Sequence, residues 1–135
     1  MSEQGTANRE QSSVRRAVRD FRDLIAWQKS MAVVETTYRL SASFPDQERY
    51  GLTSQIRRAA VSIPSNIAEG HGRGPGRAFA NHLWIANGSL REVQTQILLA
   101  AGLGYSRKDE AEKLVTDCEE VCRILVALRR SVDSG

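Results

Sequence analysis

Residues 55–73 read QIRRAAVSIPSNIAEGHGR, and this stretch decides the fold that the sequence predicts. It holds paired arginines, a proline near its middle, an Asn and a Glu three residues apart, and a glycine-rich end. Its apolar residues recur at steps of three and four, which is the period of an amphipathic helix. Together with one leucine just upstream, this apolar line consists of Leu52, Ile56, Ala59, Ile63 and Ile67.

The helix that carries this line is expected to begin near Asp46 and to end at Gly70. The Asp46 side chain can cap the free backbone N–H groups of the first turn, and glycine is a common helix end. Pro64 lies inside the helix. Because proline lacks a backbone N–H and clashes with the preceding turn, we expect a kink there. Two helices that meet at residues 62–65 are the alternative.

Three further segments have the helical period, and no segment alternates with the period of a strand. They run from about residue 23 to Phe44-Pro45, from about residue 75 to 101, and from residue 107 to 130. Their apolar lines are Leu24, Trp27, Met31, Val34 and Tyr38 in the first, Phe79, Leu83, Ala86, Leu90, Val93 and Ile97 in the second, and Leu114, Cys118, Val121, Leu125 and Leu128 in the third. Four helices with short connections predict an all-α, antiparallel up-down-up-down bundle.

One domain is predicted at residues 21–131, because a chain of 135 residues is long enough for a single core. Residues 1–20 are polar and are expected to form a disordered tail. Residues 132–135 are assigned to a C-terminal tail.

Two of the predicted helices carry apolar residues off their main lines. These residues are Trp84, Ile85, Leu99, Val115, Cys122 and Val126. A monomeric bundle needs only one inward face on each helix. The surplus therefore predicts a second buried face, and with it self-association.

The positive charge is concentrated in the middle of the chain. The net charge is only +3, but residues 49–91 hold six arginines against one acid, Glu69. The planar guanidinium suits phosphate and carboxylate alike. The candidate nucleic-acid contacts are Arg57, Arg58, Arg73, Arg77 and Arg91. The alternative is that these arginines pair with acids on solvated faces.

The glycine-rich turn at residues 70–77, GHGRGPGR, precedes a helix N-terminus, where free N–H groups attract anions. A nucleotide-binding loop follows a strand and ends in Gly-Lys-Ser/Thr, and neither feature is present. A helix end with a flexible turn is favoured, although Arg73 and Arg77 could still hold a phosphate of a nucleic acid.

A line of polar residues runs beside the apolar line of residues 52–67. Glu69 or Glu92 is expected to meet Arg57 or Arg58 in the bundle or at its edge, because an isolated buried charge is costly. Such a network either fixes the helix register or builds a functional site. Its proposed members are Ser62, Asn66, Glu69, Ser89 and Glu92.

No catalytic, metal or cofactor site is predicted. Cys118 and Cys122 have no histidine at a zinc-ligand spacing and are expected to be ordinary buried thiols. No acid is followed by the Glu-x-x-His spacing of a di-iron bundle, and His71 and His82 have no visible nucleophile partner. The chain also lacks an apolar signal core and a run long enough to span a membrane. We expect a cytoplasmic protein that is not an enzyme.

Three strings carry a family resemblance: FRDLIAWQKS at residues 21–30, FPDQERYGLTSQIRRAAVSIPSNIAEGHGR at 44–73 and LWIANGSLREVQTQILLAAGLGY at 83–105. Through them, about residues 21–128 resemble a bacterial four-helix-bundle family first noticed as proteins encoded in intervening sequences of the 23S rRNA gene. The same family includes the accessory protein of diversity-generating retroelements. The family pattern carries over at Arg57, Arg58, Ser62, Asn66, Glu69, Gly70, Arg73, Gly88, Ser89 and Glu92.

The resemblance implies a protomer that assembles as a homopentameric ring, without enzymatic activity. For the retroelement branch it also implies a basic surface that binds nucleic acid and a reverse transcriptase partner. We therefore expect a homo-oligomeric accessory factor that binds RNA or DNA through its arginines. The alternative is a protein-interaction scaffold, for example for a reverse transcriptase, whose arginines are mainly internal salt-bridge partners.

Overall fold

The computed structural model describes residues 20–134. These residues form four long helices, α2 (Ile25–Ser41), α3 (Leu52–Gly72), α4 (Arg77–Gly102) and α5 (Lys108–Ser134), and two short 3-10 turns, η1 (Phe21–Asp23) and η2 (Asp46–Glu48). No strand occurs among them. The all-α prediction with four helices is confirmed for this part of the chain. The predicted tail at residues 1–20 lies outside the described residues, apart from Asp20.

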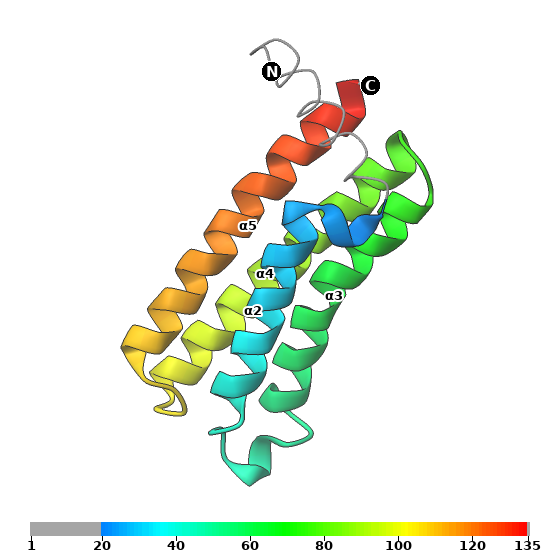
Figure 1. Ribbon diagram of the computed structural model, residues 1–135. Coiled ribbons are helices and arrows are strands. Elements are labelled where there is room, and N and C mark those ends of the chain that lie inside the picture. The colour runs from blue at the N-terminus through cyan, green and yellow to red at the C-terminus, as the bar shows by residue number, and fades with distance from the viewer. Residues whose placement is uncertain (1–19, 135) are drawn as a thin grey trace, which may run out of the picture.

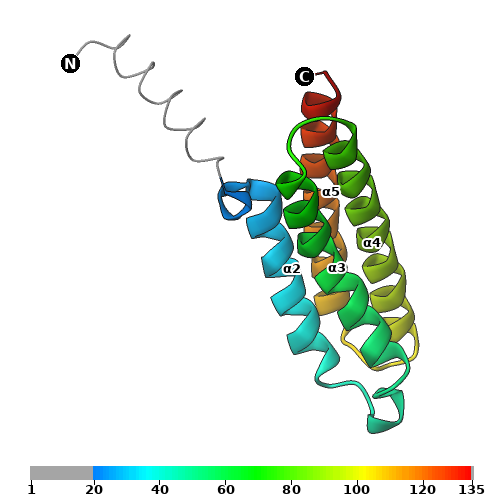
Figure 2. The ribbon, with the colours of Figure 1, turned by 90° about the vertical axis from the view of Figure 1, so that its right-hand side faces the viewer.

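The chain passes along the bundle four times (Figure 1). It descends α2, ascends α3, descends α4 and ascends α5, so helices that follow one another in sequence run in opposite directions. Each helix packs against two others, because α2 and α4 both contact α3 and α5. The start of α2, the α3–α4 turn and the end of α5 therefore lie at the same end of the bundle (Figure 2).

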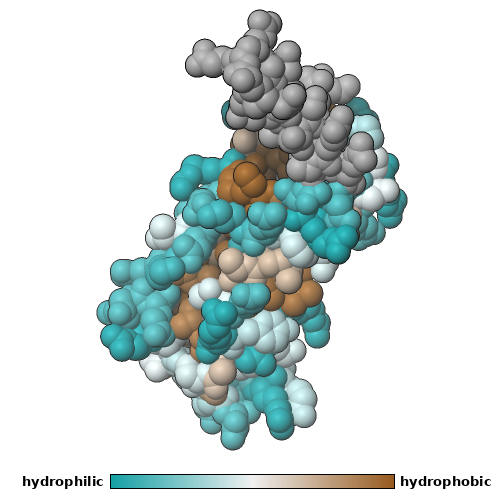
Figure 3. All heavy atoms as spheres, viewed as in Figure 1, coloured by the Kyte–Doolittle hydropathy of each residue, from teal (hydrophilic) through white to brown (hydrophobic). Residues whose placement is uncertain are grey.

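Three of the four predicted apolar lines form the core. Ile56, Ile63 and Ile67 on α3 are completely buried. Leu90 on α4 and Leu114 on α5 are also completely buried. On the face of the molecule seen in Figure 3, hydrophilic side chains predominate and apolar ones reach the surface in separate patches. No helix within residues 20–134 is long and apolar enough to cross a membrane.

The line predicted for the first helix is only partly correct: Leu24 is buried, and Trp27 and Val34 pack partly buried against the core, but they do not lie on the most buried face of the helix. Ala26, Ser30, Val33 and Thr37 point into the core, whereas Tyr38 is exposed. The hydroxyl of Ser30 donates to the Ala26 carbonyl at 2.6 Å, and that of Thr37 donates to the Val33 carbonyl at 2.7 Å. Because these hydroxyls find partners on their own helix, small polar residues can face the core.

The predicted line of α2 lies instead on a neighbouring face. Trp27, Met31 and Val34 line an apolar groove of about 270 Å³ against α3, where Val61 and Pro64 form the other wall. Ser30 and Thr37 satisfy their hydroxyls on carbonyls of their own helix, and the sequence does not show this. The buried face of α2 could therefore not be recognised from the sequence.

The predicted boundaries of α3 need two corrections. The helix begins at Leu52, because Asp46 opens the separate turn η2, and a carboxylate oxygen of Glu48 accepts the Leu52 N–H at 3.0 Å. It then continues as one helix through Pro64, so the alternative of two helices is wrong. The kink at Pro64 stays a prediction.

The C-terminal tail also needs correcting. α5 continues past Arg130 to Ser134, so the residues assigned to the tail are helical as far as Ser134. Neither glycine nor proline interrupts this stretch, and an ion pair of 3.9 Å joins Arg129 to Asp133 one turn later.

Gly70 does not end α3, as was predicted, but lies buried two residues before its end. A Cβ atom added at this position would lie 2.6 Å from Cβ of His82 on α4. The missing side chain therefore lets the two helices approach each other near the α3–α4 turn.

Candidate nucleic-acid interface

Arg57 joins α3 to the end of α2. Its Nε donates to the Ser41 hydroxyl at 2.8 Å, and one Nη donates to the Tyr38 carbonyl at 3.2 Å. Its Cζ also lies 4.6 Å from the centre of the Tyr38 ring. The guanidinium is thus engaged with α2 and meets neither Glu69 nor Glu92.

Glu69 pairs at the opposite end of α3. Its carboxylate lies 3.3 Å from Arg73 and 3.6 Å from Nε2 of His82. The expectation that Glu69 meets Arg57 is wrong for a simple reason. Twelve residues on one helix separate the two by roughly 18 Å along the axis. Arg73 and Glu69 are both more than half exposed, so this is a surface ion pair.

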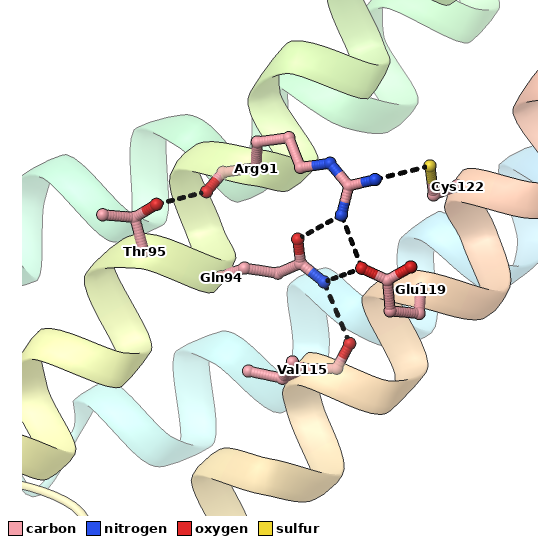
Figure 4. A network of polar contacts seen from close by, with 6 residues as sticks. All are labelled: Arg91, Gln94, Thr95, Val115, Glu119 and Cys122. Carbon is pink, nitrogen blue, oxygen red and sulfur yellow. Dashed lines mark hydrogen bonds and ion pairs between the residues drawn. The ribbon is translucent and has the colours of Figure 1, made fainter.

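Arg91 lies in a polar network between α4 and α5 (Figure 4). Its guanidinium donates to Gln94 at 2.8 Å, to the carboxylate of Glu119, and to Sγ of Cys122 at 3.3 Å. The Gln94 amide completes the network by donating to Glu119 at 3.0 Å and to the Val115 carbonyl at 3.1 Å. Arg91 is therefore only partly available to a ligand.

This network shifts two ionisation equilibria. The Gln94 amide and the Arg91 guanidinium hold the pKa of Glu119 below its ordinary value. Burial, with the nearby charges of Asp117 and Glu119, raises the pKa of the Cys118 thiol to about 12. The prediction that both cysteines are buried thiols is confirmed. Sequence reasoning missed Gln94 and Glu119, since nothing in the sequence links positions on different helices.

Arg58 and Arg77 are the exposed candidates that have no acidic partner within the described part of the chain. Neither takes part in any ion pair formed between residues 20–134. Arg77 is the first residue of α4, beside the α3–α4 turn. Of the five predicted contacts, these two therefore have the guanidinium groups most open to an anion.

Arg58 borders a polar cavity of about 320 Å³ between α3 and α4. The other lining residues are Gln55, Ala59, Ser62, Ser89, Glu92 and Gln96. Glu92 and Arg58 both line this cavity, although they form no ion pair within 4.0 Å. The predicted contact of Glu92 with Arg58 is therefore not formed, although both residues line the same cavity.

Three members of the predicted polar network come together beside this cavity. The hydroxyl oxygens of Ser62 and Ser89 lie 2.8 Å apart, and the Asn66 amide donates to Ser62 Oγ at 3.0 Å and to the Ser62 carbonyl at 2.8 Å. Glu69 lies outside this group. The three polar side chains thereby connect α3 to α4.

Trp84 and Arg129 form a contact that the sequence did not reveal. The Arg129 Cζ lies 4.7 Å from the centre of the Trp84 ring, yet Trp84 is 56% exposed. Because seven residues are nearly two helical turns, Arg77, Trp84 and Arg91 lie on one face of α4. Arg91 and Trp84 both reach α5, which assigns this face to the α4–α5 side of the bundle.

The predicted surplus of apolar residues is partly wrong. Trp84, Ile85 and Leu99 are each more than half exposed, and Leu98 and Leu103 join them. Val115 and Val126 instead pack partly buried against the core, and Cys122 is buried beneath Arg91. Of the two helices α4 and α5, it is therefore α4 that exposes these large apolar side chains.

Comparison with known proteins gives one family and one fold. A family model described as 23S rRNA-intervening sequence protein matches residues 22–127. A crystal structure of a protein of unknown function from the S23 ribosomal protein family of Bacteroides thetaiotaomicron is similar with a TM-score of 0.69 and 22% identity, over 78% of this chain and 98% of that chain. This likeness shows the fold alone. No curated protein matches the chain significantly.

Proposed function

This chain belongs to the 23S rRNA-intervening sequence protein family, and we propose that it is a non-enzymatic, homo-oligomeric accessory factor that binds nucleic acid through exposed arginines. The observation that carries the proposal is the state of Arg58 and Arg77. Both are exposed and neither has an acidic partner among the ion pairs of residues 20–134. An arginine in this state can bind phosphate without first breaking an ion pair.

The remaining predicted contacts rank below these two. The ion pair of Arg73 with Glu69 is exposed, and such pairs contribute only about 0–1 kcal/mol, so phosphate can replace Glu69 at small cost. Arg57 and Arg91 each hold partners on another helix and would bind phosphate only by giving up part of those contacts.

Self-association is the second part of the proposal. The proposed protomer is an antiparallel up-down-up-down bundle, kinked at Pro64, and five copies form a ring. The exposed Ile85, Leu98, Leu99 and Leu103 support an interface on α4, since monomeric proteins rarely expose so many large apolar side chains together. Each chain has a net charge of +3, so a ring of five copies would have a net charge of +15. The larger charge strengthens the attraction for phosphate without a new type of contact.

Binding measured as a function of salt tests the nucleic-acid function. We expect the affinity for a labelled oligonucleotide to fall as salt rises, because phosphate binding releases counterions. The double variant R58A/R77A should lower the slope of log K against log salt by about 1.4 for each bound chain on a single strand. R39A removes an exposed charge that is paired with Glu35, and serves as the control. An affinity that does not change with salt would refute the proposal.

A protein-interaction scaffold is the second candidate, and the exposed apolar residues of α4 favour it as well. A reverse transcriptase is the partner that the resemblance suggests. If this candidate holds, a nuclease-treated pull-down retains a protein partner, and the variant L98S/L99S loses it. The same variant of a purely self-associating protein changes only the mass seen in light scattering.

A further inference from the structure

We infer that Trp84 is a stacking surface for an unpaired base, which makes the nucleic-acid partner single-stranded. This inference rests on the proposed function and adds to it the kind of strand and the residue that contacts its bases. Three features of the α4–α5 side carry it: the exposure of Trp84, the cation that holds its ring, and the space and charge around it.

Trp84 lies on the exposed side of α4, next to residues that face the core. The side chain is 56% exposed, whereas Leu83 and Ala86 beside it are at most 1% exposed. Arg129 on α5 lies over the ring with its Cζ 4.7 Å from the centroid. A guanidinium on one face holds the ring in one orientation, and the exposed area is then left for the opposite face and the edge.

The surroundings of the ring favour an anionic strand. Arg77 and Arg91 lie seven residues before and after Trp84 on the same face, about 10 Å away in each direction. Gly88 lies one turn beyond Trp84, and a Cβ there would meet no atom within 4 Å. A strand that follows α4 therefore finds cations at intervals and open space beside the ring.

The acids on this side are already engaged. Glu119 is bound by Arg91 and Gln94, and Asp133 lies 3.9 Å from Arg129. These ion pairs also engage Arg91 and Arg129, so Arg77 is the arginine of this face that forms no ion pair among residues 20–134. An exposed ring near an arginine without an acidic partner favours a phosphate backbone over an acidic or neutral partner helix.

A tryptophan can stack only on a base whose face is open. In a duplex the neighbouring base pairs cover both faces, so a ring of this kind recognises single strands, and stacking is tolerant of sequence. A second copy of this chain is the competing occupant of the face, and the test below separates the two.

The chain has two tryptophans, and this makes Trp84 an intrinsic reporter. Trp27 packs edge-on against Phe21 and lines the α2–α3 groove. In the variant W27F, titration with a twelve-nucleotide uridine RNA and with the matching thymidine DNA should quench the remaining fluorescence alike. A duplex of the same length should bind through its phosphates without quenching.

Affinity measurements complete the test. W84A should weaken single-strand binding about tenfold and leave duplex binding unchanged, and W84F, which keeps a stacking ring, should restore most of the loss. I25A removes a large apolar side chain that is also more than half exposed, but from α2, and should change neither affinity. Circular dichroism of each variant checks that the helices are intact.

Salt-dependent binding without quenching, with W84A equal to the parent, overturns this inference and leaves the proposed function standing. No binding of any nucleic acid overturns both. A third outcome is that acrylamide quenches Trp84 fluorescence only after the protein is diluted. This result would place Trp84 between copies of the chain and would also overturn the inference.

Discussion

Ser62 on α3 and Ser89 on α4 place their hydroxyl oxygens 2.8 Å apart. Ser89 is only 4% exposed, so its hydroxyl depends on this partner rather than on water. Asn66 extends the contact by donating to Ser62 at 3.0 Å. One hydrogen-bonded pair thus ties the two helices that border the polar cavity.

Removing one hydroxyl of this pair should destabilise the protein. S62A leaves the Ser89 hydroxyl buried without its partner, which costs about 1–3 kcal/mol of the free energy of unfolding. The double variant S62A/S89A should cost less than the sum of the two single variants, because no buried hydroxyl then lacks a partner. Urea unfolding measures all three. The exposed S65A on the same helix should change stability by less than about 0.5 kcal/mol.

Gly70→Ala should lower stability although alanine is the better helix former. The new Cβ would lie 2.6 Å from Cβ of His82 and 3.0 Å from the Phe79 ring, so the helices must shift. Overpacking of this kind costs about 1–3 kcal/mol. Gly72→Ala is the matched control, because a Cβ at Gly72 meets no atom within 4 Å. Equal thermal midpoints for the two variants would contradict close packing at Gly70.

Thr37→Val should leave stability unchanged or raise it by up to about 1 kcal/mol. The Thr37 hydroxyl donates only to the Val33 carbonyl of its own helix, and a methyl group in the same place joins the core. Thr37→Asn, which adds bulk and polarity at a completely buried position, should instead destabilise the protein by several kcal/mol. Chemical denaturation distinguishes the two.

Glu119 should contribute stability that depends on pH. Its pKa is lower in the folded protein than its ordinary value of 4.5, chiefly because the Gln94 amide and then Arg91 bind its charged form. The contribution is therefore fully present above about pH 4.5 and is lost as the pH falls through the lower, folded pKa. The stability difference between the parent and E119Q should shrink from pH 7 to pH 3. A difference that stays constant between pH 7 and pH 3 would contradict this role of Glu119.

Cys118 should resist thiol reagents in the folded protein. It is completely buried, and its pKa is raised to about 12, so it carries almost no thiolate at pH 8. Mass spectrometry after brief labelling should find Cys118 unmodified without denaturant and modified in urea. Rapid labelling of Cys118 in the native protein would mean that the α4–α5 contact opens easily.

Much of the fold could be predicted because helical periodicity is a local property. The apolar lines of α3, α4 and α5 were predicted correctly, since apolar residues that recur at steps of three and four mark the face of a helix that packs against the core. The apolar line of α2 was not fully predicted. Ser30 and Thr37 donate their hydroxyls to carbonyls of the same helix and can therefore face the core, where Trp27 and Met31 were expected. The start of α3 was misplaced because Asp46 and Glu48 both offer capping carboxylates.

The candidate site was less predictable than the fold. The pair Glu69–Arg73 follows from a spacing of four residues on one helix and needs no tertiary information. The partners of Arg91 and the guanidinium over Trp84 come from α5, and no spacing in the sequence indicates them. Sequence reasoning therefore named Arg58 and Arg77 as candidates but could not separate them from arginines that are already engaged.

For residues 20–134, the sequence by itself determined that four long helices form, which face of three of them is buried, and where most of the turns lie. The hydrophobic period and the residues that end helices act over only a few residues, so both can be recognised directly in the sequence. Only the tertiary structure decided how each helix is rotated and shifted against its neighbours. That relative placement depends on the packing of whole faces, and it alone gives Ser62 its partner Ser89, engages Arg91, and leaves Arg58, Arg77 and Trp84 open.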